Sequence, residues 1–210
     1  MKKTVVLLVL FVLPIVAYLF FASGVNNFGR LPVLTEGVIE LPASTNDTRF
    51  QGRITVLGFL GANTEGRKGN AFNLNQKIYK RFYEFNDFQF VMLVPKGAEE
   101  DAEGLKKELS NLADTQKWLF VYQDPETITA LFNSLGTDLK LEADYGSPYV
   151  FIVDKDRNLR GRKLDEEGGT KFGFNSTSVA DLNNKMEDDI KIILAEYRLA
   201  LKKNNANRAK

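Results

Sequence analysis

The first stretch whose residue types suggest chemistry is a glycine-rich loop, residues 61–68, between an apolar run and a helical pattern. Its sequence, GANTEGRK, comes close to the phosphate-binding loop of nucleotide-binding proteins, in which backbone N–H groups and a lysine hold phosphate. That motif needs Lys and then Ser or Thr after the second glycine, where this chain has Arg67 and Lys68. The hydroxyl group that would hold Mg²⁺ is therefore missing. We interpret the segment as an exposed loop and keep a weaker anion site at the start of the next helix as the alternative.

Carboxylates are the other candidate chemistry. Acidic clusters lie at residues 99–103, 165–167 and 187–189, and paired carboxylates do acid–base work when a pocket raises one pKa. On helix and loop faces such clusters are better explained as solvated surface. Residues 154–158 begin like a calcium loop, but Leu159 stands where the loop requires glycine. A tight hairpin turn explains them better.

Cysteine and histidine are absent from all 210 residues. Without a thiol the chain has no thiolate nucleophile, no disulfide and no iron–sulfur ligation. Without an imidazole it has neither a Ser-His-Asp triad nor a conventional zinc or copper site. Only three methionines are present, one of them Met1, which disfavours a copper site made of thioethers. Carboxylate chemistry, backbone phosphate binding and plain binding remain.

The charge distribution excludes a nucleic-acid partner. The chain carries 28 Lys and Arg against 27 Asp and Glu, but six of the cations lie in the first three and the last nine residues. The body between them holds 22 cations against 27 anions, a net charge near −5. Nucleic-acid binding needs a basic face or stripe, which this body lacks. The length and the 44% hydrophobic content suit one folded domain with an appendage.

The N-terminus indicates where the protein works. Lys2 and Lys3 precede an uncharged apolar run of nineteen residues, 4–22, interrupted only by Pro14. As a helix this run is about 28 Å long, close to the ~30 Å hydrocarbon core of a bilayer. A cleaved signal peptide is the alternative, but its apolar part is usually only about 7–15 residues long. We therefore predict an uncleaved transmembrane anchor over residues 1–24, with the body outside the cytoplasm by the positive-inside rule.

Hydrophobic periodicity beyond residue 50 predicts alternating strands and helices that position the loop and the carboxylates. Continuous apolar runs, typical of strands buried on both faces, occupy residues 54–60, 90–94 and 118–122. A pattern with helical spacing follows each run, and the clearest one spans residues 179–201 near the C-terminus. The order indicates a mostly parallel sheet covered by helices.

Two local signals fix boundaries in the second half of the chain. Asp124 is a predicted N-cap, Pro125 fits the first position of a helix, and Gly136 is placed to end that helix in the left-handed conformation. Residues 149–162 form a predicted hairpin, in whose turn Asn158 can take a positive φ.

This order of elements, three strand–helix pairs followed by a hairpin and a helix, resembles the thioredoxin-like topology in its longer form. Residues 54–60 with the loop and helix behind them look like the redox strand, turn and helix of that superfamily. The segment SPYVFIVD, residues 147–154, resembles its proline strand, whose proline is cis and faces the redox loop. Among the branches, the N-terminal anchor, the helix after Pro125 and the hairpin look most like the Sco/SenC family. Those are anchored, extracytoplasmic copper chaperones for cytochrome oxidase assembly.

The chain departs from that family at the metal site. Sco-type proteins bind copper through two loop cysteines separated by three residues and through a distal histidine. Here the cysteine positions fall at Ala62 and Gly66 or, with a one-residue slip, at Asn63 and Arg67. Residues 144–146, near the expected histidine, contain none. The resemblance therefore implies the fold and the location, without copper or redox activity.

We accordingly predict an α/β thioredoxin-like domain over residues 50–202. A tether with a first strand or hairpin, residues 25–49, joins it to the anchor, and a basic disordered tail, residues 203–210, follows it. The resemblance also implies a central mixed sheet and a cis peptide bond between Ser147 and Pro148.

Two function classes remain. The first is a membrane-anchored, redox-inactive and copper-free binding or assembly module that contacts a protein partner, linked to respiratory-complex assembly by the Sco-like resemblance. The second is an enzyme that uses carboxylates or an anion-binding loop at residues 61–69. We favour the first, which needs no cofactor, metal or nucleic acid. The candidate partner surface, where the former redox loop meets the proline strand, consists of Ala62, Asn63, Gly66, Arg67, Lys68, Tyr145 and Pro148.

Charge suggests the kind of partner. Arg67 and Lys68 are expected to be exposed cations near a helix N-terminus and so to favour an acidic partner segment. Tyr83 and Phe88 form an alternative contact surface. In the aromatic segment 72–90 they lie outside the row of apolar residues with helical spacing.

Overall fold

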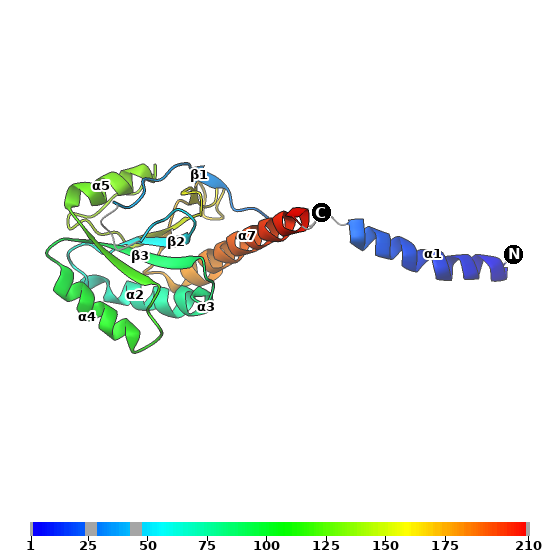
Figure 1. Cartoon of the computed structure of the whole chain (residues 1–210), viewed down its shortest axis with the longest axis horizontal. Coiled ribbons are helices and arrows are strands. Elements are labelled where there is room, and N and C mark those ends of the chain that lie inside the picture. Colours follow the sequence, from blue (N-terminus) through cyan, green and yellow to red (C-terminus); the bar gives the residue numbers. More distant parts are fainter. Residues whose placement is uncertain (1, 24–28, 43–47, 209–210) are drawn as a thin grey trace.

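The structure is a computed structural model that describes residues 2–23, 29–42 and 48–208 (Figure 1). Its elements in chain order are α1 (Lys2–Ser23), β1 (Val33–Thr35), β2 (Ile54–Phe59), η1 (Glu65–Arg67), α2 (Lys68–Leu74), η2 (Asn75–Tyr79), α3 (Lys80–Phe82), β3 (Phe88–Pro95), α4 (Glu99–Ser110), β4 (Trp118–Gln123), α5 (Pro125–Ser134), β5 (Tyr149–Val153), β6 (Leu159–Arg160), β7 (Phe174–Asn175), α6 (Val179–Asp181), η3 (Leu182–Met186) and α7 (Glu187–Arg208).

The apolar runs of the sequence form the centre of one mixed sheet. Its strand order is β1-β6-β5-β2-β3-β4, with β7 paired to β5. β2, β3 and β4 run parallel to one another, whereas β5 lies antiparallel to β2 and β6 antiparallel to β5. Every residue of β2 and β3 is buried, as expected for central strands covered on both faces. The predicted central mixed sheet and the hairpin are confirmed.

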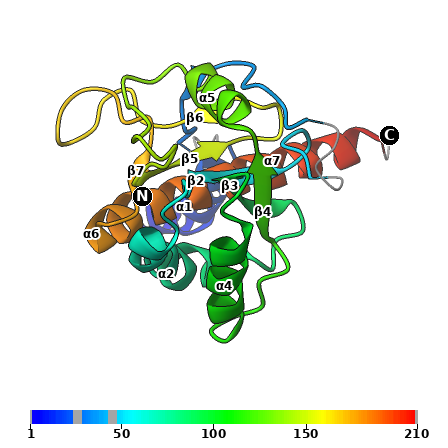
Figure 2. The ribbon, with the colours of Figure 1, turned by 90° about the vertical axis from the view of Figure 1, so that its left-hand side faces the viewer.

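Helices cover both faces of this sheet, and the loop 61–68 follows the C-terminal end of β2. α5 lies on one face, over a core that includes Phe59, Phe132 and Phe151 (Figure 2). α2, α4 and α7 lie on the other face, over a core centred on Tyr79, Phe90 and Trp118. Tilted and edge-on ring contacts at 4.8–5.8 Å bind each set of aromatic side chains together.

The aromatic surface proposed as an alternative contact is largely internal. Phe88 is 1% exposed and packs edge-on against Phe90 in the core. Tyr83 is half-buried and stacks on Tyr79 with ring centroids 5.6 Å apart. Because β3 begins two residues earlier than the apolar run suggested, Phe88 becomes a strand residue. The expectation that Phe88 is free to reach a partner is therefore wrong.

The local boundary signals were partly correct. Pro125 begins α5, and Gly136 follows it with a φ of 62°. Asp124 has the extended backbone of an N-cap but makes no capping bond, because its carboxylate pairs with Lys96 at 2.7 Å. In the hairpin turn the positive φ belongs to Arg157, at 63°, while Asp154 accepts the backbone N–H of Asn158.

The two ends of the chain also differ from expectation. α7 continues through Lys202 to Arg208, where a disordered tail was predicted. α1 has exposed apolar side chains along its length, among them Leu10 and Leu13. Within the described ranges, however, no helix reaches the combination of length and apolarity needed to cross a bilayer. The predicted transmembrane anchor has no support from the structure. Residues 25–28 and 43–47 of the predicted tether lie outside the described residues, as do residues 1 and 24 of the predicted anchor and residues 209–210 of the predicted tail.

Candidate functional site

The loop after β2 and the segment before β5 meet at the C-terminal end of the central strand. Leu60 and Gly146 form an isolated antiparallel bridge, and the N–H of Ala62 donates to the carbonyl of Asp144 at 2.9 Å. The N–H of Asn63 donates to the Asp144 carboxylate at 3.1 Å. The sequence-predicted loop and the proline strand are therefore neighbours in space.

The side chain of Arg67 fills the junction between them and is only 8% exposed. Its guanidinium donates to both carboxylate oxygens of Asp144, at 2.5 and 2.9 Å, in a bidentate pair. It also donates to Glu142 Oε2 at 2.5 Å and to the carbonyl of Leu60 at 2.8 Å. A planar guanidinium suits such a fork, and a lysine in its place would lose part of it. This cluster of Arg67, Asp144 and Glu142 is called the arginine latch below.

Two glycines make room for the latch. A Cβ on Gly146 would overlap the guanidinium carbon of Arg67. Gly61 has a φ of +67°, and a Cβ there would lie 2.7 Å from both the Asp144 carboxylate and the backbone nitrogen of Gly146. Backbone approaches this close are open only to glycine. Gly61 and Gly146 are thus both matched to the contact between Arg67 and Asp144.

Electrostatics keep the arginine latch ionised. Burial alone would lower the pKa of Arg67, but hydrogen bonds from Arg67 to Asp144 and the charges of Asp144 and Glu142 outweigh burial and raise that pKa. Burial would likewise raise the pKa of Asp144, yet the bonds it accepts from Arg67 and from the backbone of Asn63 and Gly146 hold that pKa below its usual value. Both partners therefore stay charged across the neutral range.

These contacts correct the expectation for the two loop cations. Arg67 is not an exposed cation, because the structure uses it internally as the latch. Lys68 is half-buried, and its ammonium pairs with Glu108 at 2.6 Å and with Glu65 at 3.5 Å. Arg67 is therefore not free to bind phosphate or an acidic partner, and Lys68 is already paired with two carboxylates. The sequence pattern missed this because Glu142 and Asp144 lie more than 70 positions away along the chain.

The other residues of the candidate partner surface lie around the latch. Ala62, Asn63 and Gly66 are exposed, whereas Tyr145 and Pro148 are half-buried. The structure brings all of them to one end of the sheet. None of the described peptide bonds is cis, so the predicted cis bond before Pro148 is wrong. The chain instead turns ahead of β5 at Tyr145, whose φ of 65° is in the left-handed region that non-glycine residues rarely adopt.

The surface around the latch is acidic, which the sequence did not suggest. The side chains of Glu65, Glu142 and Glu108 are 81, 55 and 45% exposed, against 9% for Arg67 and 28% for Lys68. The cations lie inward and the carboxylates outward. A partner approaching this end of the sheet therefore meets net negative charge.

A shallow groove extends this surface along α5. It has a volume of about 380 Å³ and is lined by Pro125, Glu126, Thr129 and Asn133 of that helix and by Tyr145. Tyr145 belongs both to the groove and to the segment that holds the latch. Glu126 adds another exposed carboxylate to the lining of the groove. The groove thus continues the acidic surface.

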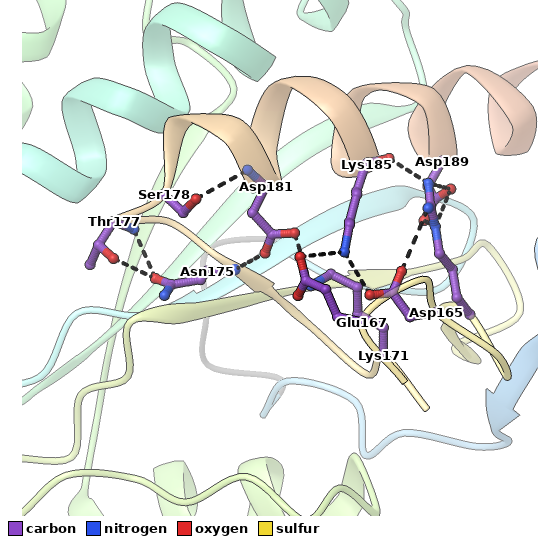
Figure 3. A network of polar contacts seen from close by, with 10 residues as sticks. Asp165, Glu167, Lys171, Asn175, Thr177, Ser178, Asp181, Lys185 and Asp189 are labelled. Atoms are coloured by element: carbon purple, nitrogen blue, oxygen red, sulfur yellow. Dashed lines mark hydrogen bonds and ion pairs between the residues drawn. The ribbon is translucent and has the colours of Figure 1, made fainter. Parts of the chain in front are cut away.

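A second hollow, of about 420 Å³, lies between β7 and the start of the C-terminal helix and is polar (Figure 3). Three ion pairs surround it: Lys171 with Asp181 at 2.8 Å, Lys185 with Asp165 at 2.6 Å, and Arg162 with Asp189 at 2.8 Å. Figure 3 shows Asp181, Lys185 and Asp189 of the helical segment facing Asp165 and Lys171, which lie between β6 and β7. Each cation is matched by a carboxylate from another element.

This network corrects the interpretation of two acidic clusters as solvated surface. Asp165, Glu187 and Asp189 have side chains that are 4, 7 and 2% exposed, and each is paired with a cation. Burial raises the pKa of Asp189 even though Arg162 opposes that shift. The paired carboxylates hold the C-terminal helix to the sheet, and none is left free for acid–base chemistry. The enzyme alternative gains no support here.

Comparisons with solved structures show the fold. The chain is similar to a putative protein disulfide isomerase from Bacteroides thetaiotaomicron, with a TM-score of 0.50 and 9% identity over 80% of this chain and 95% of that one. It is equally similar to a putative electron transfer protein from Aquifex aeolicus, with a TM-score of 0.50 and 15% identity over 78% and 97%. BsSco, a member of the Sco family of cytochrome c oxidase assembly proteins, matches at a TM-score of 0.45 and 13% identity over 73% and 95%.

No protein-family model and no curated protein matches the chain. At these low identities the structural matches show the fold alone. The predicted thioredoxin-like α/β fold is confirmed, and a Sco-family protein is among its structural neighbours. The chain contains no cysteine.

Proposed function

We propose that this protein is a non-catalytic, redox-inactive and copper-free binding module built on a thioredoxin-like fold. One observation carries the proposal: Arg67 is locked to Asp144 and Glu142. The Sco/SenC resemblance places a cysteine at Gly66 or, with a one-residue slip, at Arg67. A bidentate ion pair between the loop and the proline strand holds both segments in one arrangement. A rigid loop on a rigid sheet is suited to recognition.

The outward carboxylates specify the chemistry of the partner. Glu65 and Glu142 project from the loop end, and Glu126 continues the negative charge along α5. We therefore replace the acidic partner of the sequence-based prediction with a basic one, a lysine- or arginine-rich protein segment that lies along the groove beside Tyr145. Complementary charge of this kind raises the association rate and selects the partner.

The place of action remains a prediction. Attachment to the extracytoplasmic side of the inner membrane follows from Lys2, Lys3 and the apolar segment behind them, and a part in respiratory-complex assembly follows from the Sco-like resemblance alone. Fractionation of cells that express the full chain tests the location. Recovery of the intact chain in the soluble fraction would contradict membrane attachment.

Peptide binding tests the proposed surface. Labelled decalysine is titrated with the full chain, and its fluorescence anisotropy is followed at low and at physiological salt. We expect binding that weakens as salt rises, because exposed charges are screened. Glu65→Gln combined with Glu142→Gln should weaken it several-fold. Glu36→Gln with Glu84→Gln, two exposed carboxylates elsewhere on the body, is the matched control. Equal loss in both double variants, or no binding at low salt, would contradict the proposal.

A further inference from the structure

β4 forms a free edge of the sheet, and its outward backbone groups can be assigned from the ladder. The N–H of Phe90 donates to the carbonyl of Lys117, and the N–H of Lys96 donates to that of Gln123. Between these bonds the parallel register is unbroken, so the odd-numbered residues of β4 face β3. Phe120 and Tyr122 therefore present their N–H and C=O groups away from the sheet. In the described part of the chain, these four groups have no intramolecular partner.

This edge has none of the features that usually block strand pairing. Proteins protect an exposed edge with charged side chains, proline, bulges or very short strands. β4 has the sequence WLFVYQ, with no charge and no proline, and its register with β3 is regular. The N–H of Trp118 is already bonded to the carbonyl of Thr115. The available part of the edge is thus Phe120 to Tyr122.

α4 presents a pair of opposite charges beside this edge. The hydroxyl of Tyr122 donates to Glu103 at 2.9 Å, and the ammonium of Lys106 lies 6.0 Å from the ring centre of Phe120. Lys68 contacts Glu108 on the opposite side of the helix, whereas Glu103 and Lys106 lie on the β4 side, as does Glu99 one turn before Glu103. The helix and strand run antiparallel, with Glu103 level with Tyr122 and Lys106 level with Phe120.

We propose that two copies of this chain associate through antiparallel pairing of their β4 edges, with Phe120 of one copy opposite Tyr122 of the other. This register satisfies all four free backbone groups on each copy. Centring the pair on Phe120 instead would place Tyr122 opposite Trp118, whose N–H is already used. The two-fold axis consequently passes through Val121.

The same register makes the flanking helices complementary. Because Phe120 lies opposite Tyr122 of the second copy, Lys106 lies opposite Glu103 of that copy, twice per dimer. α4 contacts both β3 and β4, so the two α4 helices would lie about 10 Å apart, a normal packing distance for helices. The match of backbone and charge in one register argues for a second copy as the occupant of this edge. The β4 edge and the side of α4 that carries Glu103 and Lys106 are distinct from the latch surface, to which α4 contributes only Glu108. This inference therefore does not depend on the proposed function.

Disulfide trapping tests the register, and the absence of native cysteine makes it specific. Facing residues at a two-fold axis have Cα atoms within the range that a disulfide bridges, about 4.4–6.8 Å. Full-length chain carrying Val121→Cys should form a covalent dimer on mild oxidation with diamide. Leu119→Cys should not form a covalent dimer. Leu119 lies on the same face of β4, but in this register it is opposite residue 123 of the second copy, four positions away from the second Leu119. Equal cross-linking of both variants, or none with Val121→Cys, would overturn the proposal.

Charge exchange tests the interface without relying on a core substitution. Glu103→Lys and Lys106→Glu should each weaken self-association of the full chain by about tenfold or more, because each dimer contains two such contacts. An equimolar mixture of the two variants should recover it as a heterodimer, measured by sedimentation velocity. Glu100→Lys and Lys107→Glu, which lie on the solvent side of α4, are the matched controls. If the mixture associates no better than either variant alone, the proposed pairing is wrong.

Discussion

Replacing Arg67 by methionine should destabilise the protein more than any other single loss of a loop charge. Methionine keeps most of the side-chain volume but removes all four hydrogen bonds to Asp144, Glu142 and Leu60. The Asp144 carboxylate and the Leu60 carbonyl then remain at the junction without their main partner. The sequence alone predicted the opposite, because it placed Arg67 on the surface.

The size of the effect follows from burial. Breaking a fully buried ion pair by removing one partner costs about 3–5 kcal/mol, because the other charge is left uncompensated. Here the Asp144 side chain is 26% exposed and that of Glu142 55% exposed, so water recovers part of the loss. We expect a decrease of about 2–3 kcal/mol in the free energy of unfolding. For Lys68→Met, whose partners are largely exposed, we expect a much smaller decrease, because water screens such a pair.

Urea unfolding followed by tryptophan fluorescence measures both variants, because Trp118 lies in the core. Arg67→Lys should recover only part of the loss, since an ammonium cannot make the bidentate contact. Arg67→Met combined with Asp144→Asn should cost less than the sum of the two single changes, because the residues act as a pair. If Arg67→Met is no more destabilising than Lys68→Met, or if the double variant is strictly additive, the arginine latch does not contribute to stability as argued.

Three further predictions concern stability at acidic pH, the space around Gly146, and copper binding. Asp144, Asp165 and Glu187 have pKa values held below their usual range, since bonds from cations outweigh the effect of burial. These carboxylates stabilise the folded state fully at pH values above the carboxyl pKa of the unfolded chain, which is about 4. The stabilisation is lost as the pH falls through their lower pKa values in the folded state. The urea concentration at the midpoint of unfolding should therefore decrease below about pH 4. Gly146→Ala should cost about 1–3 kcal/mol by forcing the guanidinium aside, whereas Gly69→Ala, with open space around it, should not destabilise. The purified chain should bind no stoichiometric Cu(I) by competitive titration, since no thiol or imidazole is present, and tight equimolar binding would contradict the copper-free proposal.

The sequence by itself determined the fold class, because that information is local and periodic. Continuous apolar runs identified β2, β3 and β4, and their alternation with helical patterns indicated a covered parallel sheet. The absence of Cys and His excluded thiol and imidazole chemistry without any structure. Short elements were missed. β7, for example, is two residues long and depends on pairing with β5 rather than on its own pattern.

Only the tertiary structure decided what the charged residues do. Arg67 and Asp144 are 77 positions apart, and Arg162 and Asp189 are 27 apart, so no periodicity relates them. Burial of a charge depends on which segments the sheet brings together, and a charged residue that looks solvated in the sequence becomes internal once its partner arrives from another element. The register of β4 with β3 likewise decides which backbone N–H and C=O groups of β4 point away from the sheet. The side-chain pattern of a continuous apolar run does not specify that register.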